Sequence, residues 1–154
     1  MADLEASRRA RDPHILPKHL MMMAASGTIY EDGKLLVVRD NQGFWAGVGG
    51  WIENGETPEE AIVREVREEL GVESKVVAHH RPFIAWNVTN GEMPIHFLLF
   101  PHALRLLSHD LKPDPAEVTG VAWVTPADLE SYDMTPHVRN IHDLRLAEWL
   151  AAFD

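Results

Sequence analysis

Residues 50–72, GWIENGETPEEAIVREVREELGV, decide the fold and carry the chemistry. Three glutamates in this stretch, Glu65, Glu68 and Glu69, stand at positions i, i+3 and i+4, which share one face of an α-helix. Three clustered negative charges repel one another, so this face needs a cation to be stable. Hard divalent cations take oxygen ligands and often contact substrate phosphates as well. The stretch therefore predicts a helix that holds a divalent cation.

The ends of this helix are marked by the residues around it. Thr57 can cap the N-terminus, Pro58 suits the first helical position, and Glu60 completes a capping box. Gly71 suits the position at which a helix stops. We therefore predict a helix over residues 58–70, with an apolar face at helical spacing made of Ala61, Ile62, Val66 and Leu70.

A glycine-rich segment, residues 45–50, precedes the helix and is predicted to be a loop. Glycine lets the backbone approach a ligand or an ion closely. A phosphate-binding P-loop would need Lys-Ser or Lys-Thr after its last glycine, and this segment has neither. The predicted order is thus a strand, a glycine-rich loop and an acidic helix.

The rest of the chain is typical of one globular domain, since 154 residues suffice for a hydrophobic core. There is no cysteine, so neither a disulfide nor a thiolate metal site can form, which fits a cytoplasmic protein. No stretch reaches the ~18 apolar residues that a membrane span needs. We expect a flexible arm at residues 1–19, a single domain at 20–154, and no membrane partner.

The formal net charge is −10 at pH 7. A basic face for binding nucleic-acid duplexes is therefore not expected. An acidic protein can still act on an anionic phosphate, because metal ions bridge two negative partners.

The remaining patterns predict strands flanked by helices. Turns are expected at Asp32-Gly33 and Asn90-Gly91, and Pro101 predicts a bend or an edge position. Proline after threonine, at 125–126 and 135–136, opens a short helix and a longer one that ends near residue 153. Such a mix favours an α/β/α sandwich. The expected strands are residues 20–30, 34–39, 76–88 with a break near 82, 92–107 and 121–124.

The quoted stretch resembles the signature of the Nudix hydrolases, G-x5-E-x7-R-E-U-x-E-E-x-G-U with U aliphatic, and every fixed position matches. One looser feature differs, because the Pro-Gly-Gly often found before this box is Val48-Gly49-Gly50 here. The resemblance implies the Nudix fold, a mixed β-sheet between helices. It also implies hydrolysis of a nucleoside diphosphate linked to another group, a small nucleotide substrate, and Mg²⁺ with Mn²⁺ as a substitute. A homodimer is left open.

The resemblance also assigns roles within the box. Glu65, Glu68 and Glu69 would supply carboxylate ligands to the metal, with the carbonyl of Gly50 nearby. One of these glutamates, or a glutamate elsewhere, would act as the general base.

Three further residues are given catalytic or supporting roles by the same resemblance. Arg64 should orient the following glutamate by a charge-assisted hydrogen bond. Glu56 should fix the loop and Arg64 rather than bind metal. Glu117, just before the strand at 121–124, is a second candidate for ligand or base, with a surface glutamate as the alternative.

Candidate substrate contacts are Trp45, Arg39 and Trp86. The alternatives are a core position for Trp45 and a surface charge at a strand end for Arg39. Residues 87–90 contain neither the proline expected of ADP-ribose hydrolases nor the tyrosine expected of dinucleoside polyphosphate hydrolases. This favours a nucleoside triphosphate or another nucleotide derivative. A catalytically silent nucleotide sensor is the alternative function, although such a module is expected to lack catalytic carboxylates.

Overall fold

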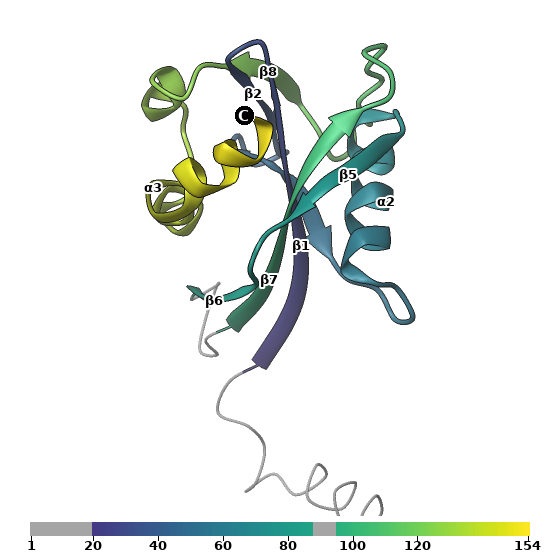
Figure 1. Ribbon diagram of the computed structural model, residues 1–154, viewed down its shortest axis with the longest axis vertical. Helices are drawn as coiled ribbons and strands as arrows, with labels where there is room; N and C mark the ends of the chain where they lie inside the picture. The colour runs from purple at the N-terminus through teal and green to yellow at the C-terminus, as the bar shows by residue number, and fades with distance from the viewer. Residues whose placement is uncertain (1–19, 88–94) are drawn as a thin grey trace, which may run out of the picture.

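The computed structural model describes residues 20–87 and 95–154 (Figure 1). The arm expected at 1–19 and the turn expected at Asn90-Gly91 lie outside these residues. None of the helices in the described ranges combines the length and apolar character needed to cross a membrane. The elements are β1 (Leu20–Glu31), β2 (Lys34–Arg39), β3 (Trp45–Ala46), β4 (Val48–Trp51), α2 (Pro58–Leu70), β5 (Ser74–His79), β6 (Phe83–Asn87), β7 (Ile95–Leu106), β8 (Gly120–Val124), the 3₁₀ turn η1 (Asp128–Ser131), α3 (Pro136–Leu150) and η2 (Ala151–Phe153).

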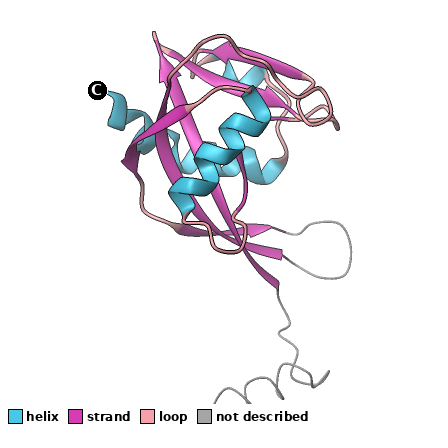
Figure 2. Ribbon diagram, turned by 90° about the vertical axis from the view of Figure 1, so that its right-hand side faces the viewer, coloured by secondary structure: helices cyan, strands magenta, loops and turns pink. Residues whose placement is uncertain are grey.

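The strands form one mixed sheet between the two α-helices, which confirms the predicted fold class. The strand order is β3-β2-β1-β7-β5, with β4 also pairing with β1, β6 with β7, and β8 with β2. The β1–β7 pair is parallel and the other pairs are antiparallel. α2 covers one face of the sheet and α3 the other (Figures 1 and 2).

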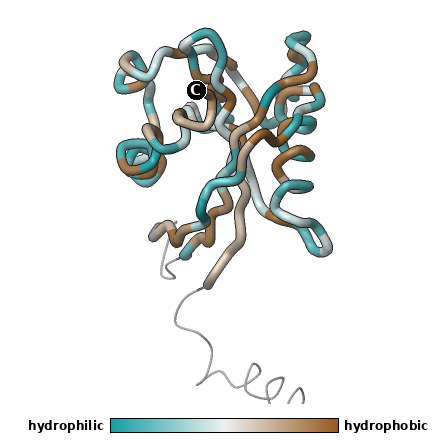
Figure 3. Tube along the Cα trace, viewed as in Figure 1, coloured by the Kyte–Doolittle hydropathy of each residue, from teal (hydrophilic) through white to brown (hydrophobic). Residues whose placement is uncertain are grey.

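Strand β2 shows why the sheet is covered on both faces. Its run of apolar residues does not alternate with polar ones, as expected of a strand buried on both sides. Leu36 and Val38 belong to the core cluster that includes the apolar face of α2. Leu35 and Val37 belong to the second cluster, against which residues of α3 pack. Figure 3 shows hydrophobic stretches in the central strands and on α2.

The glycine-rich segment is not the predicted loop, because it contains the strands β3 and β4. β4 pairs antiparallel with β1, so that Gly50 lies opposite Ala25 and Gly49 opposite Ser26. A side chain at Gly49 would place its Cβ 2.6 Å from the carbonyl oxygen of Ala25. The glycines therefore allow β4 to pair closely with β1. The prediction of a loop was wrong because it took glycine only as a loop residue.

The long strand predicted at 76–88 is two strands, β5 and β6, which both pair with β7. Pro101 lies in β7 opposite the gap between them, and its carbonyl accepts a hydrogen bond from the backbone N–H of His80 (2.9 Å). The N–H and C=O of a strand residue point to the same side, so the N–H that proline lacks falls at this gap. A proline is tolerated inside β7 for that reason.

Candidate active site

The N-terminus of α2 forms the predicted capping box. The Thr57 side chain accepts a hydrogen bond from the backbone N–H of Glu60 (3.2 Å), and the Glu60 carboxylate accepts one from the backbone N–H of Thr57 (3.0 Å). At the other end Gly71 adopts a left-handed conformation with φ 69° and ends the helix. Glu65 and Glu69, four residues apart on the helix between these ends, both lie against strand β4.

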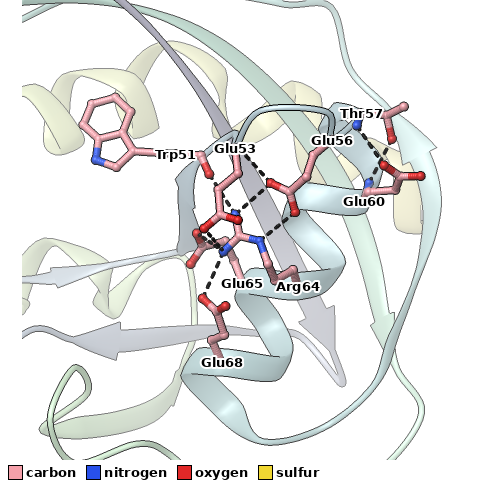
Figure 4. Close-up of polar contacts among 8 residues, drawn as sticks. All are labelled: Trp51, Glu53, Glu56, Thr57, Glu60, Arg64, Glu65 and Glu68. Carbon is pink, nitrogen blue, oxygen red and sulfur yellow. Dashed lines mark hydrogen bonds and ion pairs between the residues drawn. The ribbon is translucent and has the colours of Figure 1, made fainter.

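Arg64 joins the helix to the loop that precedes it (Figure 4). Its Nε and Nη2 donate to both oxygens of Glu56 (2.7 and 3.0 Å), and Nη2 also donates to the carbonyl of Trp51 (2.9 Å). Its Nη1 donates to Glu65 (3.0 Å) and to Glu68 (3.0 Å). The pKa of Arg64 is raised, chiefly by the hydrogen bond with Glu56. The predicted contacts of Arg64 with Glu56 and Glu65 are therefore present in the structure.

Glu69 is the most deeply buried carboxylate of the box, with 9% of its surface exposed. Its Oε1 accepts a hydrogen bond from the backbone N–H of Gly49 (3.4 Å). Its Oε2 is buried and has no hydrogen-bond partner in the described part of the chain. Burial, followed by the charge of Glu65, raises the pKa of Glu69 to about 8. An unpartnered buried oxygen is costly, and a cation or a proton would relieve that cost.

Glu65 lies against the backbone of Gly50. A side chain at Gly50 would overlap with the carboxylate of Glu65, so glycine is required here for space. Burial raises the pKa of Glu65, Arg64 opposes that rise, and the charges of Glu68 and Glu117 add to it. The predicted metal ligands Gly50 and Glu65 are thus neighbours in the structure.

Glu117 lies in the turn that leads to β8, where its backbone N–H donates to the carbonyl of Asp114 (3.0 Å). Its side chain is exposed. The negative charge of Glu117 contributes to the raised pKa of Glu65 and of Glu69. The fold therefore brings Glu117 to the same side of the molecule as the box glutamates.

The predicted substrate contacts Arg39 and Trp45 are engaged in packing around β2. Arg39 donates to the hydroxyl (3.1 Å) and to the carbonyl (3.3 Å) of Thr119, and its guanidinium lies 5.6 Å from the centre of the Trp45 ring. Trp45 meets Tyr132 edge-on at 5.1 Å. These contacts favour the structural roles that the sequence left open. Trp86 lies in β6, but its side chain is outside the described part.

Trp51 is an aromatic residue that the sequence analysis did not select. It directly follows Gly50 in β4, is 45% exposed, and its ring centre lies 5.0 Å from that of Phe97 in β7. Had residues 48–51 been read as a strand, the alternation of side chains would have placed Trp51 near the box on the opposite face.

The donor set fits a hard divalent cation in kind, since it offers carboxylates, a backbone carbonyl and the unpartnered Oε2 of Glu69. As they stand, no three acidic, histidine or cysteine side chains within 20–87 and 95–154 form a group that could hold a metal ion. Arg64 engages one oxygen of Glu65 and one oxygen of Glu68, and these two hydrogen bonds do not use the other oxygen of either carboxylate.

Comparison with known families decides how the site is classified. A family model described as the NUDIX domain matches residues 21–145. The chain belongs to the Nudix family of hydrolases. The resemblance seen in residues 50–72 is therefore confirmed by the match to most of the chain.

Two curated relatives of this Nudix chain differ in how much of their length it covers. It is 33% identical over 115 residues to the putative mutator protein MutT4 of Mycobacterium tuberculosis. This aligned stretch covers 75% of this chain but only 43% of that protein. It is 29% identical over 124 residues to the CTP pyrophosphohydrolase of Escherichia coli, covering 75% of this chain and 84% of the relative.

Among solved structures, the crystal structure of a UDP-X diphosphatase is similar with a TM-score of 0.72 and 20% identity, covering 99% of this chain and 71% of that one. The Nudix hydrolase from Nitrosomonas europaea has a TM-score of 0.65 and 20% identity, covering 83% and 90%. At such identities these likenesses concern the fold.

The raised pKa of Glu69 predicts a pH-dependent stability of the metal-free protein. The folded-state value of about 8 lies above the ordinary 4.5, so the folded protein binds more protons than the unfolded chain between these values. The contribution of Glu69 to the stability of the parent protein therefore falls as pH rises through this interval, by at most ~1.4 kcal/mol per pH unit. The Glu69→Gln variant has no carboxyl group to titrate at this position. The melting temperature of the variant relative to that of the parent should therefore rise with pH.

Thermal melts of both proteins in a metal chelator, at several values between about pH 5 and about pH 8, measure this difference. A difference in melting temperature that does not change with pH would contradict a protonated Glu69 in the metal-free protein.

Proposed function

We propose that this protein hydrolyses a diphosphate bond in a nucleoside diphosphate linked to another group, in a Mg²⁺-dependent reaction in which water attacks phosphorus. The observation that carries this proposal is the buried, unpartnered oxygen of Glu69 beside Glu65 and Glu68 on one helix face. Relatives named pyrophosphatase or pyrophosphohydrolase support the reaction type. We also infer a cytoplasmic location, which is consistent with a sequence that contains no cysteine.

In this proposal Glu65, Glu68, Glu69 and the Gly50 carbonyl hold the ion. Bound Mg²⁺ or Mn²⁺ would neutralise phosphate oxygens and favour ionisation of water. Arg64 holds the helix and the loop in place relative to each other, because its planar guanidinium donates hydrogen bonds to several acceptors at once. Burial and mutual repulsion raise the pKa of Glu65 and Glu69, which brings such groups toward the range in which a carboxylate accepts a proton effectively.

A panel of nucleotides tests this function. The relatives carry different substrate names, among them CTP pyrophosphohydrolase, ADP-ribose pyrophosphatase and putative 8-oxo-dGTP diphosphatase. The panel should therefore span nucleoside triphosphates, oxidised nucleotides, nucleotide sugars and dinucleotides, with release of phosphate or pyrophosphate measured in Mg²⁺. We expect at least one substrate to be cleaved, and cleavage of none would contradict the proposal.

A catalytically silent nucleotide sensor is the second candidate. It is favoured by the finding that no three acidic, histidine or cysteine side chains among the described residues are arranged to hold a metal ion. A sensor would bind a nucleotide without forming product during long incubation at high protein concentration. Product formation under these conditions excludes the sensor.

Glu117→Gln is expected to lower turnover at least about tenfold with little change in melting temperature. The charge of Glu117 acts on two box glutamates, and in this proposal its carboxylate completes the metal shell or accepts a proton, effects that are typically worth ~10–10⁴-fold. Glu130→Gln, at an exposed position in η1, is the control and should match the parent. If Glu117→Gln also matches the parent, Glu117 is a surface residue and the base lies within the box.

A further inference from the structure

Glu117 needs a restraint to stay on the side of the molecule that carries the box glutamates. Its side chain is exposed, and within residues 20–87 and 95–154 it has no hydrogen bond or ion pair. Its charge acts unfavourably on Glu65 and Glu69, because a like charge disfavours the ionised form of a neighbouring carboxyl group. Repulsion therefore favours movement of the Glu117 carboxylate away from the box, and the restraint against it must come from the backbone.

The turn at 114–118, which carries Glu117, is closed by Asp114. The carbonyl of Asp114 accepts hydrogen bonds from the backbone N–H groups of Glu117 (3.0 Å) and Val118 (2.8 Å), and its side chain accepts one from the N–H of Ala116 (2.9 Å). Val118 is buried in the core cluster that includes the apolar face of α2. These contacts shape the turn, and the next residue, Thr119, attaches it to the sheet.

The end of β2 holds Thr119 by its backbone and by its side chain. The N–H of Thr119 donates to the carbonyl of Arg39 (2.8 Å), and its hydroxyl donates to the carbonyl of Asp40 (2.9 Å). The Arg39 side chain donates from Nε to the hydroxyl of Thr119 (3.1 Å) and from Nη2 to its carbonyl (3.3 Å). Strand pairing uses only backbone groups, so the bonds of the two side chains are an additional attachment.

Trp45 and Gly120 keep the Arg39 side chain at this place. The guanidinium lies 5.6 Å from the centre of the Trp45 ring, an arrangement that is favourable for a cation. A Cβ at Gly120 would lie 3.2 Å from the Trp45 ring and 3.5 Å from Nε of Arg39, so the missing side chain lets both residues pack against the start of β8. Arg39 is thus held between an aromatic ring and Thr119.

We propose that Arg39 and Thr119 are positioning residues, which hold the turn at 114–118 so that the Glu117 carboxylate remains on the side of the box glutamates. This inference rests on the proposed hydrolysis, in which Glu117 is a metal ligand or the general base. It gives Arg39 a role in turnover that needs no contact with the substrate. Loss of the attachment should therefore lower kcat and leave KM unchanged.

Two variants remove the attachment with little change of shape. Thr119→Val loses the hydroxyl, and Arg39→Met loses the guanidinium but keeps an unbranched side chain. On a nucleotide cleaved in the panel we expect kcat to fall about threefold to tenfold in each, the scale of losing one hydrogen bond, with KM within about twofold. Thr119→Ser keeps the hydroxyl and should restore the parent's kcat. Thr125→Val is the control, because it removes a hydroxyl that bonds to Asp128 (2.9 Å) at the other end of β8.

A double-mutant cycle separates positioning from a general structural role. In a Glu117→Gln background, Thr119→Val and Arg39→Met should lower kcat by less than about twofold, because the group that they position is already lost. A general structural role would lower kcat by the same factor in both backgrounds, which would overturn the inference. Parental kcat in Glu117→Gln alone, or in both Thr119→Val and Arg39→Met, would overturn it as well.

Amide hydrogen exchange of the metal-free protein, measured by NMR, tests the attachment without any reaction. The N–H groups of Glu117 and Val118 should exchange at least about threefold faster in Thr119→Val and Arg39→Met than in the parent, since exchange reports local opening. The N–H groups of α2, and both sets in Thr125→Val, should be unchanged. If exchange responds in this way but the parent cleaves no nucleotide, the hydrolysis fails and the attachment of the turn stands. Unchanged exchange in both variants overturns the inference even if nucleotides are cleaved.

Discussion

Glu68→Gln is expected to lower kcat at least ~10²-fold in Mg²⁺, the scale of losing one electrostatic contact to the transition state. In our proposal its carboxylate is a metal ligand, and glutamine keeps the shape of the side chain while removing the charge. The Glu68 side chain is 48% exposed, and its one described ion pair is with Arg64 at 3.0 Å. The fold should therefore survive the change, so that the loss of activity reports on chemistry.

The matched control is Glu59→Gln, an exposed glutamate in the first turn of the same helix. Its described partner is His79 at 3.1 Å, an exposed pair that should contribute little to stability. Steady-state rates and thermal melts of both variants measure the comparison. Full activity of Glu68→Gln would reject Glu68 as a ligand, and unfolding of Glu68→Gln would show that its role is structural.

Arg64→Ala is expected to lower both stability and turnover. Removing a charged hydrogen-bond donor from partners shielded from water typically costs ~1.5–3 kcal/mol, and the Arg64 side chain is only 17% exposed. The substitution leaves Glu56 and Glu65 without their cation and frees the carbonyl of Trp51. We expect a loss near the lower end of that range and a fall in kcat of at least about tenfold, because Glu65 loses its orienting partner.

Arg67→Ala is the control for this prediction, because Arg67 lies one turn along the same helix. Its pair with Glu73 is 53% and 54% exposed, so the loss of stability should be much smaller than for Arg64→Ala. Chemical denaturation measures both variants, and kcat is measured under conditions where each is folded. Equal losses in the two variants would contradict the central position of Arg64.

Much of α2 could be predicted from the sequence because its signals are local. The capping box at Thr57 and Glu60, Pro58 at the first position and Gly71 at the end all act within a few residues. One neighbour of Arg64 was predictable in the same way, since i, i+4 spacing places Glu68 beside it, whereas its partner Glu56 was expected from the family resemblance.

Features that depend on pairing between distant segments could not be predicted in the same way. Residues 45–50 read as a loop because glycine is frequent in loops, yet β1 pairs with Gly49 and Gly50 and makes the segment a strand. The burial of Glu69 is also a tertiary effect, because it depends on the backbone of Gly49, which is 20 residues away in sequence. Trp51 could not be selected from the sequence either, because the direction of its side chain depends on β4 being a strand.

The most direct test of metal-dependent attack of water at phosphorus uses a nucleotide that the panel identifies as a substrate. Its hydrolysis is followed in ¹⁸O-labelled water in two reactions, one with Mg²⁺ and one after exhaustive chelation of metal ions. We predict that the label enters one of the phosphate products in Mg²⁺, that no product forms in the chelator, and that Mg²⁺ or Mn²⁺ restores the reaction. Full hydrolysis after chelation, or product whose phosphates carry no label, would contradict this mechanism.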